Sequence, residues 1–172
     1  QAWTAEDIPS QEGRLALVTG ANSGLGLATI QALAARQATV ILACRSSRKA
    51  EAAQQQLQDQ GLSRLELLEL DLADLSSVQR AAESVRDRYG HLDLLINNAG
   101  VMAPPRRTTV QGHELQFGVN HLGHQALTQA LLPLMENRPD ARVVTVTSGA
   151  QYFGRIHCCL LYTSPSPRDL ST

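Results

Sequence analysis

The sequence predicts an α/β fold with a doubly wound parallel sheet, truncated after about its fifth strand. Short apolar runs alternate with helix-like stretches from residue 14 to about residue 147. The runs are continuously apolar instead of alternating with polar residues, which indicates strands that are buried on both faces. A glycine-rich turn, residues 19–26, follows the first run. Strands separated by helices in this way form parallel sheets with helices on both sides.

Each element follows from its local composition. Residues 39–43 are β-branched and apolar, as strands prefer, whereas residues 47–60 are rich in Ala, Gln, Glu and Leu, which lose little entropy in a helix. Ser76 or Ser77 is the expected cap of the third helix. The expected strands are residues 15–19, 39–43, 65–70, 92–96 and 142–146, and the expected helices are residues 24–36, 47–60, 76–89 and 113–137.

The chain divides into three parts. Residues 1–13 form a polar N-terminal extension, and residues 14–156 form one incomplete nucleotide-binding domain. Residues 157–172 change in composition, and their Ser-Pro-Ser-Pro run blocks regular structure. Because LLYTSPSPRD resembles translated adapter sequence, we expect this tail to be foreign to the fold; an ordinary disordered terminus is the alternative.

Composition excludes several classes of function. Fifteen basic and sixteen acidic residues give a net charge of -1, so no basic field would hold nucleic acid. No apolar stretch approaches the ~18 residues that a membrane span needs, and the N-terminus lacks the pattern of a signal peptide. The three cysteines are odd in number and form no metal pattern. These features favour a cytoplasmic protein.

The glycine-rich turn has the features of a nucleotide site. Gly20 permits the tight turn, Gly24 lets backbone amides approach a pyrophosphate, and Gly26 lets the helix pack closely on the strand. A glycine turn without a ligand is the alternative. The predicted cofactor-binding loop comprises Gly20, Asn22, Ser23, Gly24, Leu25 and Gly26. In this strand–turn–helix context the fold expected is of the Rossmann type.

Four motifs in this order resemble the short-chain dehydrogenase/reductase family over residue 14 to about residue 157. They are TGANSGLG at the turn, NNAG at residues 97–100, Asn120 and Ser148. The segments ACRS, INNAGVM, VNHLGH and GRIH, at residues 43–46, 96–102, 119–124 and 154–157, are similar to the retinol-dehydrogenase-like and WW-domain-oxidoreductase-like branch. The resemblance implies an oxidoreductase that uses a nicotinamide cofactor.

The end of the second strand predicts NADP(H) in preference to NAD(H). A carboxylate there would bond the ribose 2′-hydroxyl of NAD, but the position holds Cys44, and Arg45 follows it. A guanidinium suits the 2′-phosphate of NADP, and we expect no acid nearby to repel that phosphate. A solvated surface arginine is the alternative interpretation of Arg45.

The resemblance implies further cofactor contacts after the third and fourth strands. Asp71 would accept the adenine amino group, and the backbone of Leu72 would add a contact. A turn-forming Asp that bonds its own backbone is the alternative. The Asn98 side chain would steady the sheet, while Ala99 and Gly100 would let the ribose approach. A strand-ending turn is the alternative for this segment.

The resemblance assigns catalysis to Ser148, which would hold the substrate oxygen, and to Asn120, which would bind a water in a proton relay from a helix position facing the core. The family's Tyr-x-x-x-Lys pair is missing, because Lys49 is the single lysine. Four residues after Tyr162 stands a serine, and four after Tyr152 an isoleucine. We therefore expect the chain as written to be inactive.

The expected parent protein is an NADP(H)-dependent carbonyl reductase or alcohol dehydrogenase, homo-oligomeric, that takes a small and lipophilic substrate. A non-catalytic nucleotide-binding or interaction module is the alternative. His121 and His124 lack the spacing and the partners of a metal site. Gln37 stands where the family has a glycine, and a left-handed turn there would cost ~1 kcal/mol. The fifth strand is expected to be an unprotected edge.

Overall fold

A computed structural model describes residues 4–152 of the 172-residue chain. Its centre is a five-stranded sheet in the order β3-β2-β1-β4-β5, and every neighbouring pair of strands is parallel. The strands are β1 (Leu15–Thr19), β2 (Thr39–Cys44), β3 (Leu65–Glu69), β4 (Leu94–Asn97) and β5 (Arg142–Thr145). The predicted fold class is confirmed. The predicted tail, residues 157–172, lies outside the described residues.

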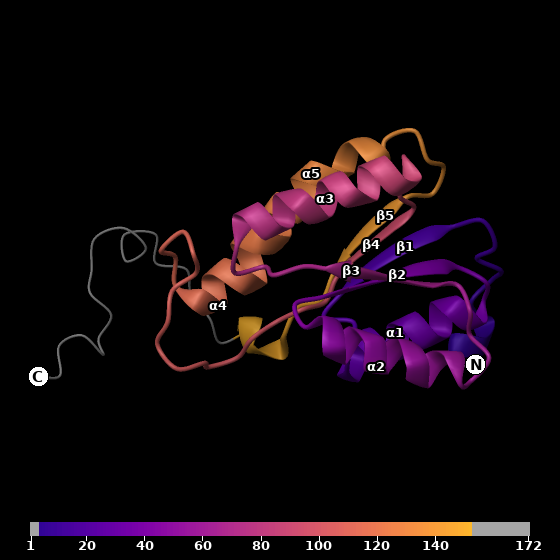
Figure 1. Ribbon diagram of the computed structural model, residues 1–172, viewed down its shortest axis with the longest axis horizontal. Helices are drawn as coiled ribbons and strands as arrows, with labels where there is room; N and C mark the ends of the chain where they lie inside the picture. Colours follow the sequence, from indigo (N-terminus) through magenta and orange to yellow (C-terminus); the bar gives the residue numbers. More distant parts are fainter. Residues whose placement is uncertain (1–3, 153–172) are drawn as a thin grey trace, which may run out of the picture.

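Helices cover the two faces of the sheet. On one face lie α1 (Gly24–Ala35) and α2 (Ser47–Gln58), and on the other lie α3 (Leu75–Tyr89) and α5 (His124–Leu131) (Figure 1). All five residues of β1 are buried. Ala16 and Val18 belong to the apolar cluster under α1 and α2, whereas Leu17 belongs to the cluster under α3 and α5. Burial on both faces explains why the strands are continuously apolar.

The N-termini of the first three long helices differ in capping. The Ser46 hydroxyl accepts a hydrogen bond from the backbone N–H of Lys49 in α2. In α3 the cap is Asp74, whose carboxylate accepts from the Ser76 N–H at 2.9 Å. The prediction of Ser76 or Ser77 was therefore wrong, because the helix begins one residue earlier and an Asp satisfies its free N–H. Ser23 makes no side-chain cap on α1.

The long helix predicted over residues 113–137 is present without a gap from Leu115 to Leu134, but its winding is not uniform. It consists of α4 (Leu115–Phe117), the π-helical turn η2 (Gly118–Gly123), α5, and the 3-10 turn η3 (Leu132–Leu134). Gly123 lies so close to β3's following loop that a Cβ would approach the carbonyl oxygen of Leu72 to 2.5 Å. Close backbone contact and Pro133 explain the irregular winding that apolar periodicity could not indicate.

The left-handed turn expected at Gln37 is present. Gln37 has a φ of 73° immediately after α1. Its N–H bonds the carbonyl of Ala34, and the N–H of Ala38 bonds the carbonyl of Leu33. This pair of bonds is a Schellman motif, which usually places glycine at the position of Gln37. The chain therefore carries local strain that the sequence had indicated.

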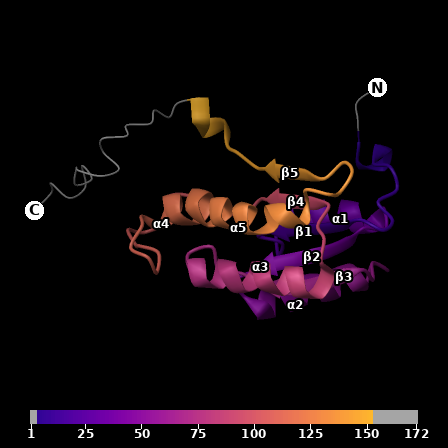
Figure 2. The same ribbon diagram turned by 90° about the horizontal axis from the view of Figure 1, so that it is seen from above.

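Strand β5 forms an open edge of the sheet, with β3 at the opposite edge (Figure 2). All four of its residues are exposed, and Val143 and Val144 retain 40% and 46% of their surface. The unprotected edge that the sequence predicted is confirmed. Within residues 4–152, no helix combines the length and the apolar character that crossing a membrane requires.

Candidate nucleotide-binding site

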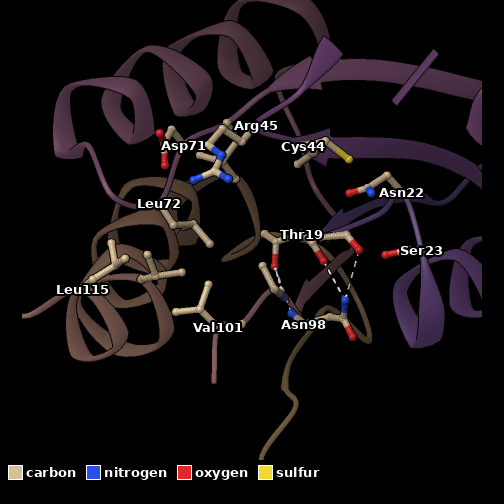
Figure 3. A pocket seen from close by; sticks show the side chains of 16 residues that line it. Thr19, Asn22, Ser23, Cys44, Arg45, Asp71, Leu72, Asn98, Val101 and Leu115 are labelled. Atoms are coloured by element: carbon tan, nitrogen blue, oxygen red, sulfur yellow. Dashed lines mark hydrogen bonds between the residues drawn. The ribbon is translucent and has the colours of Figure 1, made fainter. Parts of the chain in front are cut away.

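A cavity of about 350 Å³ lies at the carboxyl ends of β1, β2 and β4. Ligands of doubly wound sheets bind at this edge. Nine of the residues predicted to bind a cofactor line it, namely Gly20, Asn22, Ser23, Arg45, Asp71, Leu72, Asn98, Ala99 and Gly100. Asn22 and Ser23 stand at one end, and Arg45 and Asp71 stand at the other (Figure 3). Segments far apart in the sequence thus converge on one cavity.

The three positions of the turn that hold glycine differ in their structural constraints. Gly20 has a φ of +65° and lies against Ala99, while a Cβ on Gly26 would collide with the carbonyl oxygen of Gly20. Gly24 has a φ of +55°, and a Cβ there would meet nothing within 4 Å. Gly24, Gly26 and the exposed Leu25 form the start of α1 beside the cavity lining. The open space at Gly24 leaves the helix N-terminus accessible.

Thr19 and Asn98 hold the floor of the cavity together. The Asn98 Nδ2 donates to the carbonyl oxygen of Thr19 at 2.9 Å. The Thr19 hydroxyl oxygen accepts the backbone N–H groups of Asn98 and Ala99, each at 2.9 Å (Figure 3). The Asn98 side chain therefore joins the ends of β1 and β4, as the family resemblance implied. These bonds fix the backbone on which a ligand would rest.

The β2 end of the cavity is mixed in charge. Burial raises the pKa of the Cys44 thiol, against the opposing effect of the Ala21 and Asn22 backbone N–H groups, so Cys44 stays neutral near pH 7. Arg45 is exposed and lines the cavity. Asp71 lines it too, which corrects the expectation that no acid stands near Arg45: β3 pairs with β2, and their ends meet.

Asp71 also has the local role that was its alternative interpretation. Its Oδ1 accepts a hydrogen bond from the Ala73 N–H at 2.9 Å, which closes a short Asx turn. Its own backbone N–H donates to the Ser77 hydroxyl at 3.0 Å. The carboxylate has a second oxygen, so a turn-forming role and a cavity-lining role coexist.

The two predicted catalytic residues do not line the cavity. Asn120 is exposed on η2 and does not face the core as expected. Its Oδ1 accepts from the Val101 N–H and its Nδ2 donates to the Val101 carbonyl, both at 2.8 Å. Because Val101 lines the cavity, Asn120 stands directly behind its wall. Ser148 is exposed and follows the end of β5.

Sequence reasoning did not select the apolar wall of the cavity. The lining residues that it left out are Thr19, Ala43, Leu70, Val101, Leu115 and Val119. Leu115 and Val119 are one helical turn apart, and this spacing could have indicated a shared face. Val101 and Leu70 carried no such signal, because each follows a strand as an ordinary apolar residue.

The histidines of η2 and α5 do not form a metal site. His121 is exposed and stacks on Phe117, whereas His124 is buried. Among residues 4–152, no group of three His, Cys, Asp or Glu side chains is placed to hold a metal ion.

Comparison with known proteins identifies relatives of the whole described fold. The chain is 44% identical to retinol dehydrogenase 11 of Mus musculus over 84% of its own length and 46% of that protein. It is 43% identical to a short-chain dehydrogenase/reductase of Armillaria gallica over 95% of its own length and 55% of that protein. Retinol dehydrogenase 13 of Homo sapiens is 42% identical. The chain spans about half the length of these curated relatives.

Comparison with solved structures also finds relatives that share this fold. An uncharacterized protein from Mycobacterium paratuberculosis matches with a TM-score of 0.82 and 50% identity, over 94% of this chain and 56% of that one. The Pseudomonas aeruginosa RhlG/NADP active-site complex matches with a TM-score of 0.66 and 29% identity, over 78% of this chain and 54% of that one. The shared architecture thus includes a protein whose structure is described with NADP.

The sequence model of the short chain dehydrogenase family matches residues 14–164, which is most of the 172-residue chain. The resemblance drawn from the glycine turn and the NNAG segment is therefore confirmed. This chain belongs to the short-chain dehydrogenase/reductase family.

Proposed function

We propose that the chain forms the NADP(H)-binding part of an oxidoreductase that interconverts carbonyl compounds and alcohols. The observation that carries the cofactor preference is the pair at the end of β2. Arg45 lines the cavity where the ribose 2′-position of a nucleotide would lie, and Cys44 offers a neutral thiol in place of a carboxylate. The NADP complex of the Pseudomonas aeruginosa relative supports this choice.

The glycine turn is suited to the pyrophosphate. The N-terminus of α1 lacks a side-chain cap and has no acidic residue in its first turn, so its backbone N–H groups remain available to an anion. Asn22 and Ser23 line the cavity at the same end. Together these groups fit a phosphate that enters past Gly24, where a side chain would fill open space.

At the other end of the cavity we assign the adenosine. Asp71 and Leu72 line it beside Arg45, and a free carboxylate oxygen accepts hydrogen bonds from an exocyclic amino group. The nicotinamide, when bound, supplies the hydride. Ala99 and Gly100 are small, so they leave room for the ribose. Larger side chains at these positions would keep the cofactor away from the cavity floor.

For the reacting end we propose that Ser148 orients the substrate oxygen and that Asn120 holds a water for proton transfer. Neither side chain is an acid near pH 7. The single lysine, Lys49, lies in the first turn of α2, and no tyrosine precedes it by four residues. The 172 residues should therefore bind the cofactor without turning over a substrate.

The proposed substrate is a small lipophilic aldehyde, ketone or alcohol. This proposal rests on the relatives named as retinol dehydrogenases 11 and 13.

Titration of the chain with NADPH and NADH tests the cofactor assignment. A charge-assisted bond from Arg45 to the 2′-phosphate is worth about 1.5–3 kcal/mol, so NADPH should bind roughly 10- to 150-fold more tightly. Arg45→Ala should remove this preference, whereas Arg48→Ala, which changes an exposed arginine of α2 outside the cavity, should keep it. Equal affinities in the unmodified chain would overturn the assignment.

A second function, nucleotide binding without catalysis, is favoured by the location of Lys49 on α2. Both functions predict NADPH binding. They differ in the full-length transcript: a downstream Tyr-x-x-x-Lys segment favours the oxidoreductase, and its absence favours a binding module.

A further inference from the structure

His124 is a buried histidine that the proposed function does not use. It begins α5 directly after η2, and only 5% of its surface is exposed. Its Nδ1 lies 3.1 Å from the carbonyl oxygen of Asn120, and its Nε2 lies 2.9 Å from the hydroxyl oxygen of Thr19. The imidazole therefore bridges the end of β1 and the π-helical turn.

The partners of His124 fix its tautomer. A carbonyl oxygen only accepts hydrogen bonds, so Nδ1 carries a hydrogen and donates to Asn120. Burial lowers the pKa of His124, against the opposing effect of the Asn120 bond, so the ring is neutral near pH 7. A neutral ring with a hydrogen on Nδ1 has a lone pair on Nε2. Nε2 therefore accepts the hydrogen of the Thr19 hydroxyl.

The bonds of Thr19 lead to the same assignment independently. Its oxygen already accepts the N–H groups of Asn98 and Ala99, so its lone pairs are used. Its one hydrogen has two candidate acceptors, Nε2 of His124 at 2.9 Å and the carbonyl oxygen of Ile96 at 3.5 Å. The shorter contact is the better hydrogen bond. The partners of Thr19 and those of His124 thus both require that the Thr19 hydroxyl donates and His124 Nε2 accepts.

On its Nδ1 side, the His124 ring makes a hydrogen bond that takes the place of a backbone hydrogen bond of the helix. An α-helix pairs the N–H of residue 124 with the carbonyl of residue 120. Here the backbone N–H of His124 bonds the carbonyl of His121, and the ring Nδ1–H takes the carbonyl of Asn120. The imidazole thereby holds the winding at which η2 passes into α5. The Asn120 side chain in turn pairs with both backbone groups of Val101.

We propose that His124 is a positioning residue of the cofactor site, whose Nδ1–H tautomer ties the cavity floor at Asn98 and Ala99 to the Asn120 turn behind the cavity wall. The nature of the ligand rests on the proposed function. The connection itself rests on the hydrogen bonds of Thr19, His124 and Asn120. A histidine suits the position because one ring supplies a donor and an acceptor on opposite sides.

Nitrogen-15 spectra of the full chain, labelled at histidine, test the tautomer. The long-range couplings of the His124 ring should show a protonated Nδ1 and an unprotonated Nε2 near pH 7, and its signals are assigned by their loss in His124→Gln. A ring protonated on Nε2, or on both nitrogens, at this pH would overturn the proposal.

Three substitutions of His124 distinguish the effect of its hydrogen bond to Asn120 from that of its hydrogen bond to Thr19. His124→Leu removes both, His124→Asn keeps a donor for Asn120 alone, and His124→Gln keeps an acceptor that reaches toward Thr19. The Leu variant should bind NADPH about tenfold more weakly, and Gln should recover most of that loss. His121→Leu, at the exposed neighbouring histidine, is the matched control and should leave the affinity unchanged. A folded Leu variant with unchanged affinity would contradict the positioning role.

A double-mutant cycle of Thr19→Val and His124→Leu decides whether the effect passes through Thr19. Their effects on the unfolding midpoint should be less than additive, because each removes the same bond. Additive effects would contradict the connection. If the unmodified chain binds no NADPH, the proposed function fails, while the tautomer spectrum and this cycle still support or overturn the proposed connection.

Discussion

Gly20 packs against the backbone of Ala99, and a Cβ at residue 20 would lie 2.8 Å from the Ala99 Cα. The same glycine has a φ of +65°. Since Thr19 holds the backbone of residues 98 and 99 through two hydrogen bonds, Ala99 has little freedom to move away. The cavity floor therefore exists because residue 20 has no side chain.

Gly20→Val should prevent the fold, since it combines a backbone collision with a left-handed conformation that costs roughly 1–2 kcal/mol for other residues. Gly24→Val carries the same left-handed strain, but a Cβ there meets nothing within 4 Å, so this variant should fold with reduced stability and lose NADPH binding. Circular dichroism and NADPH titration check both variants. A folded Gly24→Val that binds normally would show that the turn is only structural.

Cys44→Asp should reverse the cofactor preference. A carboxylate at the end of β2 would bond ribose hydroxyls and repel a 2′-phosphate, so NADPH should weaken and NADH should strengthen. The Ala21 and Asn22 backbone N–H groups that now act on the thiol would help to accommodate the charge. Cys44→Ser keeps the site neutral and should retain the NADPH preference. Calorimetric titration with both cofactors measures the change, and an unaltered ratio in Cys44→Asp would argue against this location for the 2′-position.

Gln37→Gly should stabilise the chain by about 1 kcal/mol, because glycine adopts the left-handed turn after α1 without strain. Gln56→Gly, at an exposed position within α2, should destabilise it by a similar amount. Urea unfolding compares the two. A loss of stability in both variants would mean that the side chain of Gln37 stabilises the turn more than its φ suggests.

Asp93→Asn should reduce stability by about 1–3 kcal/mol at pH 7. The Asp93 carboxylate is buried and accepts the Leu15 N–H and the Arg138 Nε–H, each at 2.8 Å. Burial alone would raise the pKa of Asp93, but these bonds and the charge of Arg138 outweigh it, so the pKa is lowered. Asp87→Asn, at an exposed carboxylate, is the control.

The lowered pKa of Asp93 also predicts a pH dependence. A depressed folded-state pKa gives stability that is complete above the ordinary value of about 3.9 and is lost as the pH falls through the folded-state value. Urea midpoints of the unmodified chain should therefore fall steeply below about pH 4. Asp93→Asn should show a shallower fall, and an identical fall would mean that other carboxylates dominate.

The 172-residue chain should bind NADPH without oxidising it in the presence of retinal-like or aromatic carbonyls. General acid catalysis contributes ~10²–10⁴-fold, and neither Asn120 nor Ser148 supplies a proton near pH 7. A version extended by a Tyr-x-x-x-Lys segment is the positive control, and absorbance of NADPH follows the reaction. Turnover by the unextended chain that disappears in Tyr162→Phe would show that the tail contributes an acid.

Four of the five strands could be predicted to within one residue at each end. Strand β4 begins two residues later than predicted, and the winding of the segment after Pro105 could not be predicted. The continuously apolar composition of β1 indicates burial on both faces, so the predicted strand has the same first and last residues as the observed one, Leu15–Thr19. Gly118 and Gly123 of η2 stand where a Cβ would collide with Thr109 and with Leu72, and no local pattern encodes these close approaches. The sequence pattern does not show which backbone segments come close to one another in the fold.

The site was predictable where its residues belong to strand ends. Asn98 and Arg45 end or follow strands, and parallel strands bring their carboxyl ends to one edge of the sheet. Asn120 was misplaced because its expected core-facing position assumed regular α-helical winding, and η2 is π-helical. The bridging role of His124 depends on a tautomer, which only the two partners of the ring reveal.

The exposure of β5 has a consequence for how the molecule opens. Four residues pair this strand with β4, and both of its faces lack the cover that the inner strands have. Opening free energies within one protein range from nearly zero to the global value, in cooperative units set by burial. Amide hydrogens of Val143 to Thr145 should therefore exchange with deuterium far sooner than those of β1. The chain would then behave as a stable four-stranded unit with a detachable outer strand.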